Sequence, residues 1–377
     1  MHQEFISFTK KTFKTEEFIP LHAPIFIGNE KKYLNECIDS TFVSSVGKFV
    51  DLFENEMVKF TGAKHAIATS NGTAALHIAL IMAGVEHDDE VITQPLTFIA
   101  TVNALSYIGA SPVFVDVDKD TLSLSPEKLE HFLTHKTEMV NGNCINKKTK
   151  KKIKAVVPMH TFGFSARIDE IITVCNRFNI ATVEDAAESL GSYYKGQHTG
   201  TFGLLGTFSF NGNKTITTGG GGMLVTNDDE IARKAKHITT TAKIPHPWDY
   251  EHDMIGYNYR LPNINAALGF AQMEELSLIL KKKKILADKY ETFFKDKSIQ
   301  YITSPKESIS NYWLNAVLLE NLEERNSFLK VTNENGVMTR PIWKLMNSLP
   351  MFKNAQTGNL DNAKYFEERV INIPSSV

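Results

Sequence analysis

Residues 64–85 read KHAIATSNGTAALHIALIMAGV, and this stretch indicates the fold class. Its first part, His65–Thr69, is a short, mostly apolar run of the kind that forms a strand buried on both faces of a sheet. After a polar turn, apolar side chains recur at helical spacing over Thr73–Ala83, which places Leu76 and Leu80 on one face. A buried strand followed directly by such a helix predicts a layered α/β domain.

Short β-like segments alternate with helical ones as far as residue 226. The segments that we expect to be strands are His65–Thr69, Glu90–Thr93, Pro112–Asp116, Lys154–Met159, Ile180–Glu184, Gly206–Phe210 and Gly222–Thr226. Several are continuously apolar and β-branched, which favours the interior of a mostly parallel sheet. The sequence therefore predicts an α/β fold whose central sheet is mostly parallel and flanked by helices.

The pattern changes after about residue 265. A long helical segment begins at Ala266 and reaches about Phe294, and short β-like and helical pieces follow it. We expect an N-terminal segment over residues 1–24, a large domain over residues 25–265 and a smaller C-terminal α+β domain over residues 266–377.

Two lysine-rich stretches have an ordinary interpretation as solvated surface. The run Lys281–Lys284 lies within the long helical segment and is expected to be a solvated helix face, with an anionic partner as the alternative. The polar stretch Lys136–Lys152 is expected to be a surface loop or hairpin rather than a nucleic-acid site.

Upstream, Val50, Phe53 and Met57 are typical of an amphipathic helix.

Composition argues against several classes of protein. The 377 residues are 42% hydrophobic and carry a formal net charge of −2, so no basic field is available to hold nucleic acid. No apolar run approaches the ~20 residues that cross a bilayer, and the N-terminus lacks the apolar stretch of a secretory signal. Cys37, Cys144 and Cys175 are scattered, which favours a reducing compartment and argues against a structural metal site. We therefore expect a cytoplasmic protein without a metal ion.

Polar residues gather where the expected strands end. In an open α/β sheet, ligands bind beyond the carboxyl ends of the strands. The groups that follow these ends are Ser70-Asn71-Gly72-Thr73, Phe98, His160, Asp185, Asn211 and Lys214. Together they would place an anion-binding turn, an aromatic ring, a carboxylate and an amine at one rim.

The turn at Gly72 and Thr73 suits a phosphate group. It joins a strand to a helix, where free backbone N–H groups and the positive end of the helix dipole attract an anion. Ser209 alternates with Phe208 and Phe210 on its strand and could reach the same anion. The alternatives are ordinary helix capping at the turn and a hydrogen-bonded core hydroxyl at Ser209.

Asp185 and Lys214 are the charged candidates. Asp185 ends an apolar strand, where a partly buried carboxylate needs a cationic or donor partner such as a protonated pyridine nitrogen, or else forms a structural ion pair. Lys214 precedes TITTGGGGM (215–223), and a lysine desolvated at this rim would attack an aldehyde. Without that context it is an ordinary surface lysine. Phe98 could stack on a planar ring and His160 could touch a ring substituent, although both are more often structural.

Five segments resemble, in order and spacing, the DegT/DnrJ/StrS family of sugar aminotransferases, which are fold-type I enzymes dependent on pyridoxal 5'-phosphate (PLP). They are TSNGTAALHIAL (69–80), PLTFIATVNAL (95–105), VEDAAESLGS (183–192), FSFNGNKTITTGGGGM (208–223) and GYNYRLPNINAALG (256–269). The resemblance extends over about residues 20–377. One departure is the run Gly219–Gly222, because many members have a glutamate within it, and this leaves substrate positioning in that loop open.

The resemblance implies a role for each matched residue. Lys214 corresponds to the lysine that carries the cofactor as a Schiff base, and Asp185 to the partner of the pyridine nitrogen. Asn258 corresponds to an asparagine that reaches the cofactor phosphate from a neighbouring subunit, which implies a homodimer with shared active sites. The other expected cofactor contacts are Gly72, Thr73 and Ser209 at the phosphate, Phe98 over the ring, Glu188 near the ring hydroxyl, and Asn211. The expected substrate contacts are His160, Arg260 and Arg340.

A narrower resemblance, to LegC-type 4-aminotransferases, is carried by TAKIPHPWDY (241–250), SNYWLNAV (310–317) and TRPIW (339–343). It implies that an amino group passes from L-glutamate to the 4-keto group of a nucleotide-linked 4-keto-6-deoxy-N-acetylhexosamine, for a surface glycan or a nonulosonic acid or bacillosamine-type sugar. In this ping-pong scheme the Lys214 amine is the general base and acid, and Asp185 keeps the pyridinium protonated.

Four other functions are considered. A nucleotide-sugar 3-aminotransferase stays open. A PLP-dependent sugar dehydratase is disfavoured because those relatives carry histidine at the position of Lys214. A non-catalytic regulator that binds PLP or a sugar is disfavoured by the intact set of Lys214, Asp185 and Ser209. An NAD-dependent enzyme is disfavoured because the first turn lacks the GxGxxG spacing.

Overall fold

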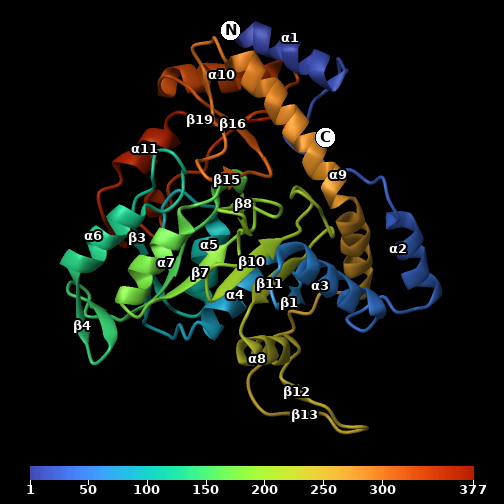
Figure 1. Ribbon diagram of the computed structural model, residues 1–377, viewed down its shortest axis with the longest axis vertical. Helices are drawn as coiled ribbons and strands as arrows, with labels where there is room; N and C mark the ends of the chain where they lie inside the picture. Colours follow the sequence, from blue (N-terminus) through green and yellow to red (C-terminus); the bar gives the residue numbers. More distant parts are fainter.

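A computed structural model describes residues 1–377, and its centre is an eight-stranded sheet (Figure 1). The strands, in spatial order, are β1 (His65–Thr69), β11 (Gly222–Thr226), β10 (Leu205–Ser209), β7 (Ala181–Asp185), β6 (Ile153–Val157), β2 (Glu90–Thr93), β3 (Ser111–Phe114) and β18 (Gln356–Thr357). Only β11 runs against its neighbours. The seven expected strands are therefore confirmed to within two residues at each end, as is the mostly parallel sheet.

Helices cover both faces of this sheet. One face packs against α4 (Gly72–Met82), α5 (Ile99–Tyr107) and α8 (Asp229–Thr239). The other packs against α3 (Lys48–Thr61), α6 (Pro126–Lys136), α7 (Ile168–Arg177) and the first half of α9 (Asn263–Phe294). In β1, Ile67 packs on the first face, whereas Ala66 and Ala68 pack on the second. This period of two explains why the three central residues of the strand are all apolar.

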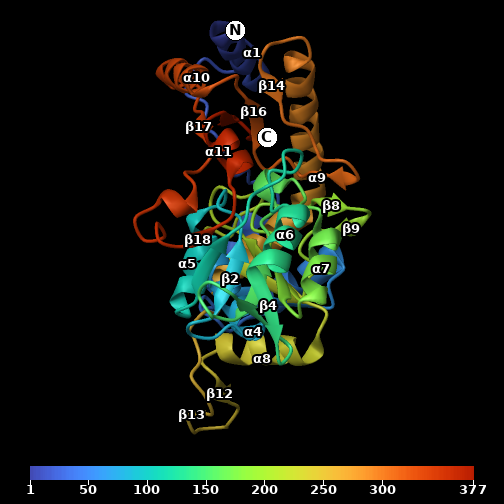
Figure 2. The same cartoon turned by 90° about the vertical axis from the view of Figure 1, so that its left-hand side faces the viewer.

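A second core lies beyond the carboxyl ends of the parallel strands. It contains the four-stranded antiparallel sheet β14 (Gln300–Tyr301), β16 (Asn315–Leu318), β19 (Val370–Ile373) and β17 (Arg340–Pro341). The helices around it are α1 (His2–Phe13), α10 (Leu322–Glu334), α11 (Asp361–Glu367) and the second half of α9. Figure 2 shows α1 and α10 together at the end opposite α8.

Helix α9 links the two cores. Its 32 residues contribute Ala267 and Leu276 to the core under the large sheet, and Tyr290 and Phe294 to the core of the smaller unit. The strand β18 comes from the C-terminal part of the chain yet pairs with β3 in the large sheet. The division at residue 265 remains a prediction, because α9 and β18 both connect the parts that it separates.

Several short elements lie outside the two main sheets and their covering helices. They are α2 (Glu30–Asp39), the hairpin of β12 (Lys243–Ile244) and β13 (Glu251–His252), the sheet of β15 (Ser308–Ile309), β8 (Tyr193–Tyr194) and β9 (Gln197–His198), and the 3-10 turns η1 (Thr161–Gly163) and η2 (Met346–Ser348). The expected hairpin in the lysine-rich stretch is confirmed as β4 (Thr137–Val140) and β5 (Asn143–Asn146).

The expectation for Lys281–Lys284 is wrong at one position. Lys283 is buried, whereas Lys281 and Lys284 are exposed. Four consecutive residues cover more than one face of a helix, because each residue is rotated by ~100° about the axis from the one before.

The three cysteines are buried and unpaired. None of the helices combines the length and the apolar character needed to cross a membrane.

Candidate active site

Most groups predicted to meet at one rim, all except Ser70 and His160, lie around a cavity of about 320 Å³. Asp185 is the last residue of β7, Ser209 is the last residue of β10, and Gly72 begins α4 just after β1. Because these strands run in the same direction, their carboxyl ends lie at one edge of the sheet. The cavity is lined by Asn71, Gly72, Thr73, Leu76, Phe98, Ala100, Thr101, Met159, Asp185, Ala187, Glu188, Ser209, Asn211, Asn213, Lys214, Gly220, Gly221, Trp313 and Trp343.

The turn at the start of α4 presents donors to this cavity. Asn71 caps the helix, and its Oδ1 accepts a hydrogen bond from the N–H of Ala74 at 2.8 Å. The N–H groups of Gly72 and Thr73 precede Ala74, and the first N–H groups of a helix have no partner inside it. A Cβ atom on Gly72 would lie 2.8 Å from the Cβ of Ser209, so glycine lets the turn approach the serine. Backbone donors and a hydroxyl therefore converge on one point, as an anion requires.

Asp185 is a buried carboxylate without a cation of its own. Its Oδ2 accepts a hydrogen bond from the Thr101 hydroxyl at 2.7 Å, and its Oδ1 accepts one from the Ala187 N–H at 3.2 Å. The residue is 5% exposed, and no lysine, arginine or histidine forms an ion pair with it. A structural ion pair is therefore not what holds it. These donors leave the carboxylate in position for a cationic group of a ligand.

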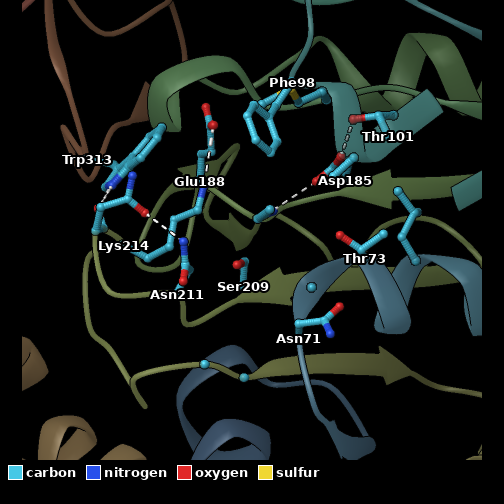
Figure 3. Close-up of a pocket in the computed structure, with 18 of the residues that line it drawn as sticks. Asn71, Thr73, Phe98, Thr101, Asp185, Glu188, Ser209, Asn211, Lys214 and Trp313 are labelled. Atoms are coloured by element: carbon cyan, nitrogen blue, oxygen red, sulfur yellow. Dashed lines mark hydrogen bonds and ion pairs between the residues drawn. The ribbon is translucent and has the colours of Figure 1, made fainter. Parts of the chain in front are cut away.

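Lys214 is not a surface lysine, because its side chain is 13% exposed. Its Nζ lies 3.4 Å from Oε1 of Glu188 and 3.9 Å from the centroid of the Trp313 ring. Figure 3 shows Lys214 and Asp185 on opposite sides of the cavity, with the Phe98 ring between them. An amine, an aromatic face and a carboxylate thus surround one space.

Glu188 is a buried carboxyl group beside the Lys214 amine. Burial raises the pKa of Glu188 to about 7, although the charge of Lys214 and the N–H of Phe162 oppose this rise. That N–H donates to Oε2 of Glu188 at 2.9 Å, while Oε1 faces the lysine. Near neutral pH the Lys214–Glu188 pair can therefore hold or release a proton inside the cavity.

The structure brings eight of the predicted site residues to this cavity. They are Gly72, Thr73, Phe98, Asp185, Glu188, Ser209, Asn211 and Lys214. Trp313, Trp343 and Thr101 also line it, although the sequence analysis gave them no role. Trp313 lies in the segment SNYWLNAV and Trp343 in TRPIW, two of the segments that carry the narrower resemblance. The presence of an aromatic residue in each of these segments was the signal that could have suggested a ligand contact.

His160 does not line the cavity, so the expected substrate contact does not fit. It is fully buried, with Nε2 3.0 Å from Oε2 of Glu184 and Nδ1 accepting from the N–H of Ala166 at 3.1 Å. Glu184 precedes Asp185 in β7, and successive side chains of a strand point to opposite faces. His160 therefore belongs to the side away from the cavity and is structural here.

Three further predicted residues lie outside the cavity. Asn258 and Arg260 are exposed on the chain that follows the β12–β13 hairpin. Arg340 is exposed in β17 of the small sheet. The roles of Asn258 and Arg260 depend on a second protomer and stay predictions, as does that of Arg340.

The sequence matches the profile of the DegT/DnrJ/EryC1/StrS aminotransferase family over residues 25–377. The chain belongs to this family. GDP-perosamine synthase of Escherichia coli O157:H7 is 38% identical over 359 residues, which are 95% of this chain and 93% of that protein. GDP-perosamine synthase of Vibrio cholerae is 36% identical over 360 residues, which cover 95% and 94% of the two chains.

Solved structures agree with this assignment. PseC of Helicobacter pylori, an aminotransferase involved in the biosynthesis of pseudoaminic acid, has a TM-score of 0.84 and 26% identity, and the match covers 95% of this chain and 94% of PseC. PLP and PMP forms of Spr1654 from Streptococcus pneumoniae share the fold, each with a TM-score of 0.85, at 24% and 23% identity. They cover 96% and 95% of this chain and 94% of Spr1654 in both cases. The protein is a PLP-dependent sugar aminotransferase.

The chemistry of the cavity fits this cofactor. PLP carries a phosphate, a basic ring nitrogen, a flat ring and an aldehyde. The cavity offers one matching group for each: the donors of the α4 turn for the phosphate, the Asp185 carboxylate for the ring nitrogen, the Phe98 ring for the flat ring, and the Lys214 amine for the aldehyde.

Glu188→Gln should change how cofactor attachment depends on pH. In the wild type, the Glu188 carboxyl is mostly neutral below its pKa of about 7 and ionised above it, where it stabilises the unreactive Lys214 ammonium. The variant lacks this carboxylate, so at pH 8 it should acquire the visible absorbance of lysine-bound PLP about two- to tenfold faster, which matches the loss of one hydrogen bond.

Below pH 6 the two proteins should differ little, since the wild-type carboxyl is then neutral. Glu17→Gln, at an exposed position, serves as the control and should follow the wild type throughout. Superimposable profiles for the wild type and Glu188→Gln would show that this carboxyl does not govern the amine.

Proposed function

We propose that this protein transfers the amino group of L-glutamate to the 4-keto group of a nucleotide-linked 4-keto-6-deoxy-N-acetylhexosamine. The observation that carries the proposal is the placement of Lys214 and Asp185 on opposite sides of one cavity, with an anion-binding turn beside them. The sugar is inferred from the segments that resemble LegC-type 4-aminotransferases.

The cavity residues divide into those that hold the cofactor and those that handle protons. Gly72, Thr73 and Ser209 would bind its phosphate, and Phe98 would lie against its ring. Asp185 would keep the ring nitrogen protonated, with the Thr101 hydroxyl orienting the carboxylate. Bound PLP supplies the electron sink that makes proton removal beside the transferred nitrogen possible.

Lys214 has two tasks in this proposal. Its Nζ would attach the cofactor and, once released by an amino substrate, would remove and return the proton that moves during transamination. General base and acid catalysis of this kind contributes about 10²–10⁴ in rate. Glu188, 3.4 Å from Nζ, can share that proton, because its own pKa is raised to about 7. The rings of Trp313 and Trp343 would keep bulk water from this exchange.

A homodimer is the second part of the proposal. The β12–β13 hairpin projects from the body beyond α8 (Figures 1 and 2). Trp248, Tyr250 and Ile255, in and just after this hairpin, are between 77% and 87% exposed. Large apolar side chains on a projecting arm are typical of a surface that a partner covers. A second copy seated there would bring Asn258 and Arg260 to the partner's cavity.

One observation favours a second sugar. The relatives from Escherichia coli O157:H7, Vibrio cholerae and Caulobacter vibrioides, which are 36–38% identical to this chain, are all named GDP-perosamine synthase. A GDP-linked keto sugar is therefore the alternative acceptor, with the same cofactor chemistry in the same cavity.

Lys214→Ala should abolish amino transfer. Wild-type protein loaded with PLP should change from yellow to colourless on addition of glutamate, because the cofactor takes up the amine. The variant retains Asp185 and the α4 turn and should still bind PLP, but without a covalent link and with turnover at least about 10²-fold lower, since it lacks the general base. Full turnover by Lys214→Ala in a coupled 2-oxoglutarate assay would contradict the proposal.

A panel of acceptors should identify the sugar. We expect kcat/KM to be at least ~10²-fold higher for a 4-keto-6-deoxy-N-acetylhexosamine than for a 4-keto-6-deoxyhexose linked to the same nucleotide, because a site that hydrogen-bonds the acetamido group rejects a sugar that lacks it. Product formation is measured by mass spectrometry, and a 3-keto sugar tests the alternative position. If the protein prefers the GDP-linked sugar, the proposed N-acetylhexosamine acceptor is wrong and the GDP-linked keto sugar is the acceptor.

Removing the apolar tip of the hairpin should dissociate the dimer. The double variant Trp248→Ser, Tyr250→Ser removes two side chains that the partner would bury. Each fully buried side chain contributes ~1.5–3 kcal/mol to the free energy of dimerisation, so the Kd of the dimer should rise at least about 100-fold. Sedimentation velocity over a concentration series measures this. Ile309→Ser, which removes an exposed apolar side chain outside the hairpin, should stay dimeric. A wild-type monomer, or a double variant as dimeric as the wild type, would overturn the assignment.

A further inference from the structure

Lys283 of α9 is a fully buried lysine outside the cavity. It is 1% exposed, and its Nζ donates to Nε2 of His22 at 2.9 Å, to the carbonyl oxygen of Trp313 at 3.2 Å and to that of Ser375 at 3.0 Å. In its charged form the amine has three donors and no acceptor, and these three acceptors match that number. No carboxylate forms an ion pair with it.

Burying the Lys283 amine costs free energy, which a purely structural contact would not require. Burial lowers the pKa of Lys283 to about 7. Burial also lowers the pKa of His22 well below its usual value, and the charges of Lys283 and Lys214 lower it further, so the imidazole stays a neutral acceptor. Apolar residues of similar volume often stabilise a core as well as buried charges do. The buried amine therefore calls for an explanation beyond packing.

Lys283 is connected to Lys214 through Trp313. Lys283 holds the carbonyl oxygen of Trp313, and the indole Nε1 of the same tryptophan donates to the carbonyl oxygen of Asn213 at 2.6 Å. Asn213 precedes Lys214 in the chain and lines the cavity. The Trp313 ring in turn lies 3.9 Å from the Lys214 Nζ. One tryptophan thus contacts the buried lysine, the backbone of the active-site loop and the active-site amine.

We propose that Lys283, supported by His22, is a positioning residue for Lys214. By fixing the Trp313 backbone it fixes the ring on which the Lys214 amine rests and the loop that carries this lysine. Lys283 does not line the cavity, and its contact with the active-site loop runs through Trp313. The inference rests on the proposed role of Lys214 as the residue that attaches the cofactor.

The test compares Lys283→Met with Lys283→Arg and with Lys281→Met. Methionine keeps the length of the side chain and removes the three donors. Arginine keeps a cationic group with N–H donors, on a slightly longer side chain. Lys281 is exposed on the same helix, so its substitution controls for the loss of a lysine. Each protein is loaded with PLP, and the bound cofactor is counted.

The main readout is the visible circular dichroism of lysine-bound PLP, which reports how firmly the chromophore is oriented. For Lys283→Met we expect a band at half the wild-type intensity or less per bound cofactor, with unchanged far-ultraviolet dichroism. We also expect kcat for glutamate to fall about tenfold while KM changes less than twofold. Lys283→Arg should recover most of both signals, and Lys281→Met should match the wild type.

A second variant keeps the inference testable if Lys283→Met does not fold. Trp313→Phe retains a ring and loses the hydrogen bond to Asn213, and it should reproduce the weakened band. Wild-type intensity in Lys283→Met, or in Trp313→Phe when the first variant is unfolded, would overturn the inference. A wild-type protein that forms no covalent PLP adduct at all would instead overturn the proposed function, so the two failures are distinguishable.

Discussion

The account depends on the desolvation of one amine. The Lys214 side chain is largely buried, and its Nζ lies between the Glu188 carboxyl and the Trp313 ring, facing the cavity. The parallel sheet makes this possible, because strand ends at one edge deliver a loop, a carboxylate and a helix N-terminus to the same space. The second core, beyond that edge, supplies the tryptophans that close the cavity.

Two carboxyl groups in this cavity have different surroundings. Asp185 accepts hydrogen bonds from the Thr101 hydroxyl and the Ala187 N–H, and no lysine, arginine or histidine forms an ion pair with it. Glu188 is fully buried beside the amine, and the pKa of its carboxyl is raised to about 7. A hydrogen-bonded carboxyl group and a carboxyl group with a raised pKa thus lie in one small space, and different surroundings are a common basis for assigning different roles to two carboxyl groups.

Much of this was predictable from the sequence, and the failures have physical causes. Seven of the eight strands of the large sheet could be recognised because strands buried on both faces are short apolar runs, and ligand groups follow their ends. Trp313 and Trp343 received no role because their place in the cavity depends on how a second core docks, which local pattern does not encode. The same is true of β18, whose two residues pair with a strand more than 200 positions earlier. His160 was misjudged because its neighbour Glu184 turns it toward the opposite face, and Lys283 because a run of lysines looks uniformly solvated.

The most direct test of the central claim is to locate the covalent bond. Wild-type protein loaded with PLP is reduced with borohydride and digested, and the peptides are sequenced by mass spectrometry. The account predicts one pyridoxyl phosphate per chain, on the side chain of Lys214 in the segment FSFNGNKTITTGGGGM. A label on any other lysine, or no label on this segment in protein that binds PLP, would contradict it.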